Sequence, residues 1–400
     1  MMTKKKIAFL TLSIALLTTL LAGAVFGQAT QKDDVYRYLS IFSEVFELVR
    51  SNYVDEVQSD KLMDGAFSGV TDAVDEFSYY VPPAQMAAHG NFADVDDNGL
   101  GLVVTKRFGY AYVIATVAGS PADKAGVKKG DFIEQIDGKS TPKMAVWQIR
   151  SALNQKKPVT MRVLRGGETK RETVSVTPAE FHPVALESDT ISGIPYVKVP
   201  YFEKGTAEQF RAALDEARKK GSRKLIVDLR GNAGGDVEEA IAAADALLTS
   251  GMITSVSGRK AEAKKWQADR ETSFDGDVQV LTDLSTAGGA EVFAAAVRDN
   301  KRGKLVGITT YGKAIVQKFV KLPSGGGVQM TIGHYTTPEQ KVIGDAGVKP
   351  DVVVDLSSQF LDEGDEDADV EEKPEEDLIL QKALELYGVS AEALEEKKAA

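Results

Sequence analysis

Between residues 184 and 355, short apolar segments alternate with amphipathic ones, and this alternation constrains the fold more than any other feature. KLIVDLRG and VQVLTDL have the length and composition of buried strands, whereas GTAEQFRAALDEARKKG and GAEVFAAAVRDN have helical spacing. Strands that alternate with helices of this length predict a mixed, mostly parallel sheet covered by helices. We therefore expect an α/β core over residues 184–357.

The segments on either side of this core differ from it. Residues 31–83 show apolar positions at steps of three and four, which predicts an N-terminal helical segment that ends at Pro82 and Pro83. Residues 84–180 contain short β-like runs and two helical pieces, so we expect a small, inserted β-rich domain there. Residues 358–400 read as an acidic tail with one terminal helix.

The first residues resemble an export signal. Three lysines at positions 4–6 precede an apolar run over residues 7–22, and small residues lie before Gln28. This pattern predicts a signal peptide over residues 1–27. The alternative is an uncleaved membrane anchor through residues 7–25, because the run approaches spanning length. Both alternatives predict an exported protein, periplasmic or otherwise extracytoplasmic, secreted or anchored by its N-terminus.

Composition excludes several kinds of chemistry. The 400 residues include no cysteine and only three histidines, so disulfides, cysteine ligands and a cysteine nucleophile are excluded and a histidine-rich metal site is not expected. The net charge is −11, and residues 362–377 hold eleven acidic side chains and one lysine. This distribution indicates a solvated tail rather than a nucleic-acid partner.

Ordered glycines characterise the β-rich segment. DNGLGLVV is followed by GSPADKAGVKKGDFIEQIDGK, in which Ser120 opens a short helix and Gly126 ends it. Glycines allow successive backbone N–H groups to converge on one anion. The segment resembles PDZ domains, and the resemblance implies that Leu100, Gly101 and Leu102 bind the C-terminal carboxylate of a peptide, which would add as a strand to the sheet edge.

Two motifs of the α/β region resemble carboxyl-terminal processing (tail-specific) serine peptidases. DLRGNAGG, residues 228–235, is similar to the family's DLRxNPGG, which implies that Gly234 or Gly235 supplies an oxyanion N–H. YGKAIVQ is similar to FGKGSVQ, which implies that Lys313 is the general base and that Gln317 orients it. No cofactor and no metal are expected.

The nucleophile motif of that family departs from the pattern here. The family has GSASASE, whereas this chain has STAGGAE over residues 285–291. Aligning Glu291 with the motif's glutamate places Gly288 at the serine position and makes the N–H of Gly289 a second, weaker oxyanion candidate. Gly288 and Lys313 are 25 residues apart, which matches the family's serine–lysine separation.

Three interpretations of Gly288 remain open at this stage. The chain could have lost peptidase activity and act as a catalytically silent peptide-binding or regulatory relative. The hydroxyl of Thr286 or Ser285 could substitute, although a shift of roughly 6–10 Å along an extended chain requires a differently shaped loop. The alignment could also be displaced by a few residues, but the match at Glu291 and the separation of Gly288 from Lys313 both argue against this. The resemblance itself implies an endopeptidase that captures C-terminal segments of exported proteins or peptides.

Overall fold

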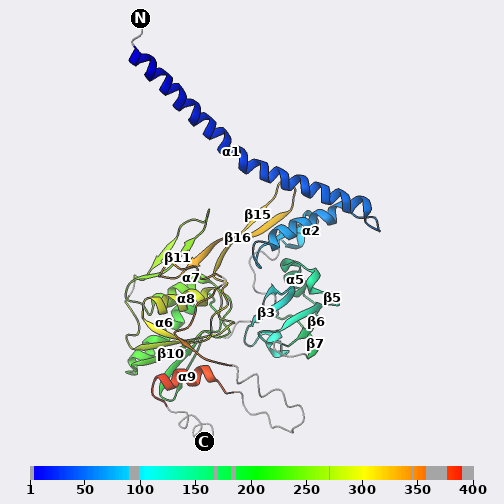
Figure 1. Ribbon diagram of the computed structural model, residues 1–400. Coiled ribbons are helices and arrows are strands. Elements are labelled where there is room, and N and C mark those ends of the chain that lie inside the picture. Colours follow the sequence, from blue (N-terminus) through cyan, green and yellow to red (C-terminus); the bar gives the residue numbers. More distant parts are fainter. Residues whose placement is uncertain are drawn as a thin grey trace. The chain divides into compact units, whose positions relative to one another are not determined.

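The computed structural model describes residues 4–89, 99–165, 170–181, 186–269, 271–344, 346–356 and 376–389 (Figure 1). The chain divides into two compact units, residues 1–69 and 70–400, and each is considered by itself.

The first unit is helical. α1 (Lys4–Asn52) is followed by α2 (Ser59–Asp72), which ends in the second unit. We expected a helix from residue 31, whereas α1 already begins at Lys4, because no proline interrupts the sequence between the apolar run and Asn52. Most side chains of the predicted export signal lie outside the described residues. Within the described part of the chain, no helix combines the length and apolarity needed to cross a membrane.

A six-stranded sheet forms the centre of the second unit. Its order is β17-β14-β13-β10-β9-β8; all neighbouring pairs are parallel except β8 and β9, which form an antiparallel hairpin. The α/β core with a mostly parallel sheet is therefore confirmed. The strands are β8 (Glu187–Ile191), β9 (Ile194–Lys198), β10 (Lys224–Asp228), β13 (Asp277–Thr282), β14 (Gly303–Gly307) and β17 (Val352–Val353).

Helices cover both faces of this sheet. Strand residues with odd and even positions point to opposite faces, so Val227 joins one cluster and Ile226 another. The first cluster includes residues of α6 (Thr206–Lys219), α7 (Val237–Asp245) and α8 (Gly289–Asp299). The second includes residues of α9 (Leu378–Leu386), which lies on the other side of the sheet in Figure 1.

An antiparallel sheet lies beside the core, in the order β1-β16-β11-β12 with β15 also paired to β16. We expected helix up to residue 83, whereas Tyr79–Val81 forms β1; its aromatic and β-branched side chains suit a strand, and its partner β16 is about 250 residues further along the chain. The other strands are β11 (Met252–Ser257), β12 (Lys265–Gln267), β15 (Ile315–Lys321) and β16 (Gly327–Thr336).

The PDZ-like domain has a sheet in the order β2-β3-β4-β6-β7, with β5 paired to β4. Among the described strands, β2 therefore lies at one end of this sheet. The elements between β1 and β8 are η1 (Pro83–Gln85), α3 (Met86–His89), β2 (Leu102–Arg107), β3 (Tyr110–Thr116), α4 (Pro121–Lys124), β4 (Phe132–Ile136), β5 (Lys139–Ser140), η2 (Thr141–Lys143), α5 (Val146–Leu153), β6 (Val159–Leu164) and β7 (Arg171–Val176).

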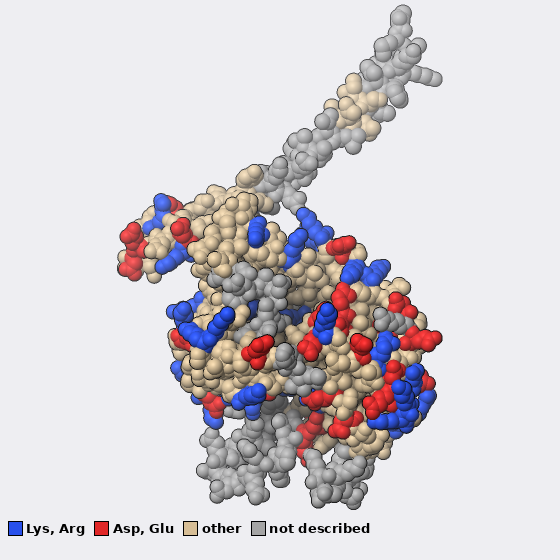
Figure 2. Space-filling model, turned by 180° about the vertical axis from the view of Figure 1, so that it is seen from behind, with Lys and Arg blue, Asp and Glu red and all other residues tan. Residues whose placement is uncertain are grey.

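Charges of both signs are interspersed on the described surface seen in Figure 2, so that face carries no extended field of one sign.

Candidate active site

The turn between β13 and α8 carries the glycine that aligns with the family's nucleophile. Gly288 immediately precedes α8 and has φ 62° and ψ −122°, a conformation that favours glycine. A sharp, strained strand-to-helix turn is also where other hydrolases present a nucleophilic serine. A Cβ atom on Gly288 would meet no heavy atom within 4 Å. The turn therefore has space for a serine side chain, which would be strained there.

One buried carboxylate joins this turn to the loop that carries the predicted base. Oε2 of Glu291 accepts hydrogen bonds from the amides of Gly288 (3.0 Å) and Lys313 (2.7 Å). Its Oε1 accepts from the amide of Gly312 (2.6 Å) and the hydroxyl of Thr310 (2.5 Å). Burial raises the pKa of Glu291 to about 7, although all four donors oppose this rise. The backbone amides of Gly288 and Lys313 therefore both donate to Oε2 of Glu291.

The predicted base and its partner lie at the start of β15. Lys313 is half-buried just before the strand, and Gln317 lies within it. The side-chain amide of Gln317 donates to the carbonyl of Phe77 at 2.9 Å. The hydroxyl of Tyr311 donates to Glu76 at 2.9 Å. Glu76 and Phe77, just before β1, therefore bind the two ends of the YGKAIVQ segment, at Tyr311 and Gln317.

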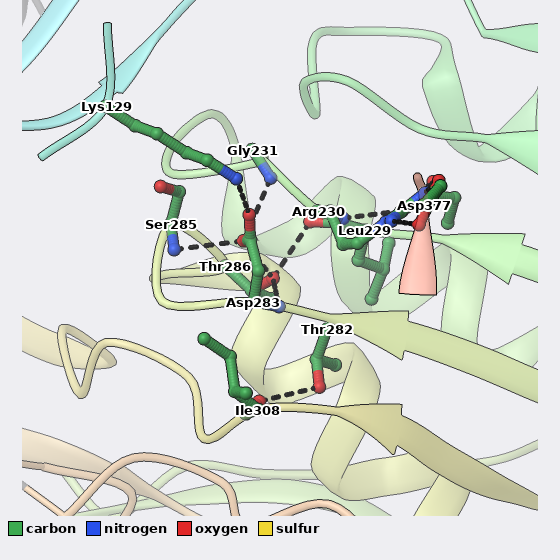
Figure 3. Close-up of polar contacts among 11 residues, drawn as sticks. Lys129, Leu229, Arg230, Gly231, Thr282, Asp283, Ser285, Thr286, Ile308 and Asp377 are labelled. Atoms are coloured by element: carbon green, nitrogen blue, oxygen red, sulfur yellow. Dashed lines mark hydrogen bonds and ion pairs between the residues drawn. The ribbon is translucent and has the colours of Figure 1, made fainter. Parts of the chain in front are cut away.

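The two candidate substitute hydroxyls lie in the turn before Gly288 (Figure 3). The hydroxyl of Thr286 is 3.0 Å from the carbonyl of Leu229 and 3.2 Å from Oδ1 of Asp283, and it accepts from the amide of Asp283 at 3.0 Å. Ser285 is also buried, and its amide donates to the same Oδ1 at 2.9 Å. The Thr286 hydroxyl is therefore committed to holding the turn.

Asp283 also connects this turn to other parts of the molecule (Figure 3). Its Oδ1 accepts from the amide of Gly231 at 3.1 Å, and Gly231 belongs to the DLRGNAGG motif. Its Oδ2 accepts from the ammonium group of Lys129 at 2.6 Å, and Lys129 lies in the PDZ-like domain between α4 and β4. One carboxylate thus contacts both predicted catalytic loops and the neighbouring domain.

The predicted oxyanion loop lies against the nucleophile turn. The amide of Ala287 donates to the carbonyl of Asn232 at 2.9 Å. The amides of Gly234, Gly235 and Gly289 donate to no acceptor among the described residues. Gly234 and Gly289 are buried, and nothing in the geometry selects between Gly234 and Gly235.

Arg230 connects the same motif to the C-terminal helix. Its guanidinium group donates to both carboxylate oxygens of Asp228 and to both of Asp377, the N-cap of α9. Despite burial, these two carboxylates raise the pKa of Arg230 further. A cavity of about 310 Å³ beside this cluster also reaches Lys129 and Asp283. Arg230 thus joins the DLRGNAGG motif to the first turn of α9.

The predicted carboxylate-binding loop lies directly before the edge strand β2. The side chains of Leu100 and Leu102 are buried in the core of the PDZ-like domain. The backbone of Gly101 has φ 75°, and a Cβ atom there would lie 2.2 Å from Cβ of Ser120. Leu100 and Leu102 therefore shape the loop from inside.

The PDZ-like domain also packs on the predicted catalytic loops. A shared apolar cluster joins side chains of β2 and β3 to Ala233, next to Gly234, and to Ala287, next to Gly288. The members from the PDZ-like domain are Val103, Tyr112, Ile114 and Ala115. The neighbours of both predicted loops are therefore covered by this domain.

Gly288 and Lys313 share the carboxylate of Glu291, and the turn before Gly288 contacts Gly231 and Asn232 of the DLRGNAGG motif. The catalytic roles of these residues stay predictions. Sequence reasoning used Glu291 only to align the motif and missed its position between the two loops. A glutamate three residues after a helix N-cap is a known capping signal and could have revealed it. No local signal identifies Asp283, Glu76 or Phe77 as partners, because their contacts depend on the tertiary fold.

Comparisons with known proteins agree with this geometry. The chain matches Peptidase family S41 over residues 193–354 and a PDZ domain over residues 112–165. It is 30% identical over 324 residues to the carboxy-terminal processing protease CtpA of Bacillus subtilis, which covers 78% of this chain and 68% of that protein. It is 29% identical over 361 residues to the carboxy-terminal-processing protease of Bartonella bacilliformis, covering 88% and 83%.

A solved structure, the photosystem II D1 C-terminal processing protease, is similar with a TM-score of 0.64 and 25% identity, covering 78% of this chain and 92% of that one. The mixed α/β core and the inserted PDZ domain are thus shared with a processing protease. On the fold, the motifs and these similarities, the chain belongs to the PDZ-containing carboxy-terminal processing proteases, a family of serine-type peptidases.

Proposed function

We propose that this chain is an exported member of the family that binds the C-terminal segments of exported proteins or peptides without cleaving them by the family's serine–lysine route. The observation that carries this proposal is Gly288, which stands in the nucleophile turn beside Lys313 with no hydroxyl of its own. A lysine base at this position has no O–H group to deprotonate, so no acyl-enzyme can form there.

The contacts of Thr286 argue against a substitute nucleophile. Its hydroxyl bonds to Leu229 and to Asp283 within the buried turn. To attack a substrate it would have to leave these partners and reach a base, which requires a distance of about 3 Å. Ser285 lies one residue further from Gly288 and is itself buried. The silent relative is therefore favoured over a displaced hydroxyl.

Other groups in the site suit peptide binding. The amides of Gly234 and Gly289 can donate to a peptide carbonyl. The glycine loop leads directly into β2, which is where the resemblance to PDZ domains puts a peptide that ends in a carboxylate. In this proposal the PDZ domain selects the chain end, and the site behind it holds the peptide without attack.

Restoring the hydroxyl tests the silent site. We expect the wild-type chain to remain unlabelled by a fluorophosphonate probe and to leave peptides with free C-termini intact. The variant Gly288→Ser should become labelled, because the turn has room for the side chain. Gly288→Ala introduces the same backbone strain without a hydroxyl and should stay unlabelled. Adding Lys313→Ala to Gly288→Ser should abolish labelling.

Cleavage by the wild-type chain that Thr286→Val abolishes and Thr286→Ser retains would overturn the silent-site proposal in favour of a displaced nucleophile. If Gly288→Ser folds, as shown by an unchanged unfolding temperature, but stays unlabelled, the assignment of the turn is wrong.

Binding is tested separately with fluorescent peptides. A peptide with a free C-terminal carboxylate should bind, and the same peptide ended by an amide should lose most of that affinity. Equal affinity for both peptides would contradict carboxylate recognition. Export is tested by fractionating expressing cells and by sequencing the N-terminus of the recovered protein, with cleavage expected before Gln28 or, for an anchor, intact residues 1–27 in the membrane fraction.

A further inference from the structure

The turn between β2 and β3 holds a bulky aromatic residue where small residues are favoured. Phe108 and Gly109 form this two-residue turn, and both have positive φ, 50° and 85°. Hairpin turns with two positive φ angles favour Asn-Gly, because a bulky residue is strained in the left-handed region. The Phe108 side chain is 82% exposed, so packing within its own domain does not offset this strain. A strained residue at an exposed turn points to a role in binding.

Further aromatic side chains surround this turn. Tyr110, which is 39% exposed, pairs with Arg107 across the hairpin. The guanidinium group of Arg107 lies over two rings, 5.4 Å from the centroid of Phe108 and 5.2 Å from that of Tyr112. The ring of Phe132, in β4, lies 6.4 Å from that of Phe108 and 5.0 Å from that of Tyr112. We call Arg107, Phe108, Tyr110 and Phe132 the hairpin cluster.

The hairpin cluster continues into the contact between the PDZ domain and the predicted catalytic loops. Phe132 and Tyr311 both pack against the apolar cluster that joins this domain to those loops. Tyr311 lies two residues before Lys313, the predicted base. Burial and the neighbouring Glu76 raise the pKa of Tyr311, whereas the positive charge of Arg107 lowers it, so the guanidinium group lies near the same loop. The exposed part of the hairpin cluster therefore lies at the border of the candidate site.

Arg107 supplies the charge of the hairpin cluster. Among the residues that the structure describes, no carboxylate lies within ion-pairing distance of its guanidinium group, whose contacts are the two aromatic rings. An arginine that stacks on rings through its flat face still presents N–H donors at its edge, and these match a carboxylate. The adjacent Lys106 donates to the carbonyls of Pro142 and Met144 and adds a second positive charge. The hairpin cluster is thus complementary to an aromatic side chain with an acidic neighbour.

We propose that the hairpin cluster is a specificity subsite for a bound peptide, and that it takes an aromatic side chain followed by an acidic one. The inference rests on the proposed function, because it requires a peptide whose chain end lies at the glycine loop before β2. β2 spans six residues between that loop and the turn, so an extended peptide needs about six residues to reach Phe108. Phe108 and Tyr110 contact the aromatic ring, and Arg107 pairs with the carboxylate.

Peptides that differ at one residue test this subsite. The full chain is titrated with a fluorescent peptide that ends in a free carboxylate and carries the pair Phe-Glu about six residues before its end. Replacing the phenylalanine of the peptide by alanine should weaken binding about ten-fold, because the ring contact is lost. Replacing the glutamate by glutamine should weaken binding about three-fold, as expected for a partly exposed ion pair.

Phe108→Asn separates binding from folding. Asparagine is favoured in this turn, so the unfolding temperature should rise, while the affinity for the phenylalanine peptide should fall to that for the alanine peptide. The alanine peptide should bind the variant and the wild type equally. Arg107→Gln should remove only the preference for glutamate over glutamine. Tyr53→Ala, at an aromatic side chain that is 61% exposed in the other unit, is the matched control and should change neither preference.

The outcomes distinguish the subsite from the proposed function. A wild-type chain that binds the phenylalanine and alanine peptides equally would overturn the subsite and leave peptide binding intact. An equal loss of both peptides in Phe108→Asn would also overturn it, because the turn would then act on the whole peptide site or on a different partner. If neither peptide binds the wild-type chain, both the subsite and the proposed function are wrong.

Discussion

Two buried carboxylates organise the two sides of the candidate site, and they do so with different partners. Glu291 accepts from four donors, three of them backbone amides, and makes no ion pair among the described residues. Asp283 accepts from two amides, the hydroxyl of Thr286 and the ammonium group of Lys129. The first carboxylate is enclosed by its own domain, whereas the second reaches a cation of the PDZ domain.

The difference shows which side of the site can respond to its surroundings. The contacts of Glu291 connect Gly288 to the base loop within one core, so they depend on the protonation of a single buried group. The contacts of Asp283 include a lysine whose side chain is 61% exposed, so they depend on the neighbouring domain and on salt. The following predictions test this contrast.

Removing the enclosed carboxylate should have the largest effect. Glu291→Ala leaves four donors without their acceptor, two of them buried and two half-buried, and we expect a loss of about 3–5 kcal/mol in the free energy of unfolding. Glu291→Gln keeps the shape and one acceptor oxygen and should lose less. Chemical unfolding followed by tryptophan fluorescence measures both, since Trp266 packs on the core and Trp147 is buried. A loss no greater for alanine than for glutamine would contradict the role of these four bonds.

Sequence motifs predicted the strands and loops of the candidate site, but not the residues that contact those loops. KLIVDLRG and VQVLTDL form strands β10 and β13 as expected, because the composition of a short segment predicts its local structure. The loops that carry Gly288 and Lys313, which the motifs assigned to one site, meet at the carboxylate of Glu291. The partners of these loops were not predictable. Phe77 meets Gln317 across 240 positions of sequence, and that contact exists only because β1 pairs with β16. The helix expected up to residue 83 is replaced by β1 for the same reason.

The pH dependence of stability should also distinguish the two carboxylates. Burial raises the pKa of Glu291 from 4.5 to about 7, so between these values the folded chain holds a proton that the unfolded chain has released. The stability of wild type relative to Glu291→Gln should therefore be greatest below pH 4.5 and fall, by on the order of 3 kcal/mol, as the pH rises through 7. Urea unfolding of both proteins across this range measures the difference.

The exposed Glu208→Gln serves as the control for that titration and should show no such trend relative to wild type. A constant difference between wild type and Glu291→Gln from pH 4.5 to pH 8 would show that Glu291 is ionised throughout, held so by its four donors.

The turn held by Asp283 should tolerate a change of hydroxyl but not its loss. Thr286→Val removes the bond to Leu229 and the acceptor for the Asp283 amide, and we expect a loss of about 1–3 kcal/mol in unfolding free energy. Thr286→Ser keeps both bonds and should lose only the packing of one methyl group, about 1 kcal/mol. Thermal unfolding of the two variants checks this order. Equal losses would mean that packing, and not the hydroxyl, holds the turn.

The smallest effect should come from removing the ammonium group of Lys129, which pairs with Asp283. Lys129→Met removes the 2.6 Å ion pair with Asp283, but the lysine is mostly exposed, so we expect less than about 1 kcal/mol. That loss should shrink in 1 M salt, because screening already weakens the pair in the wild-type chain. Lys128→Met, an exposed neighbour, should change neither value. A salt-independent loss at Lys129 would mean that the pair behaves as a buried one, and the contrast between an enclosed and a responsive carboxylate would then fail.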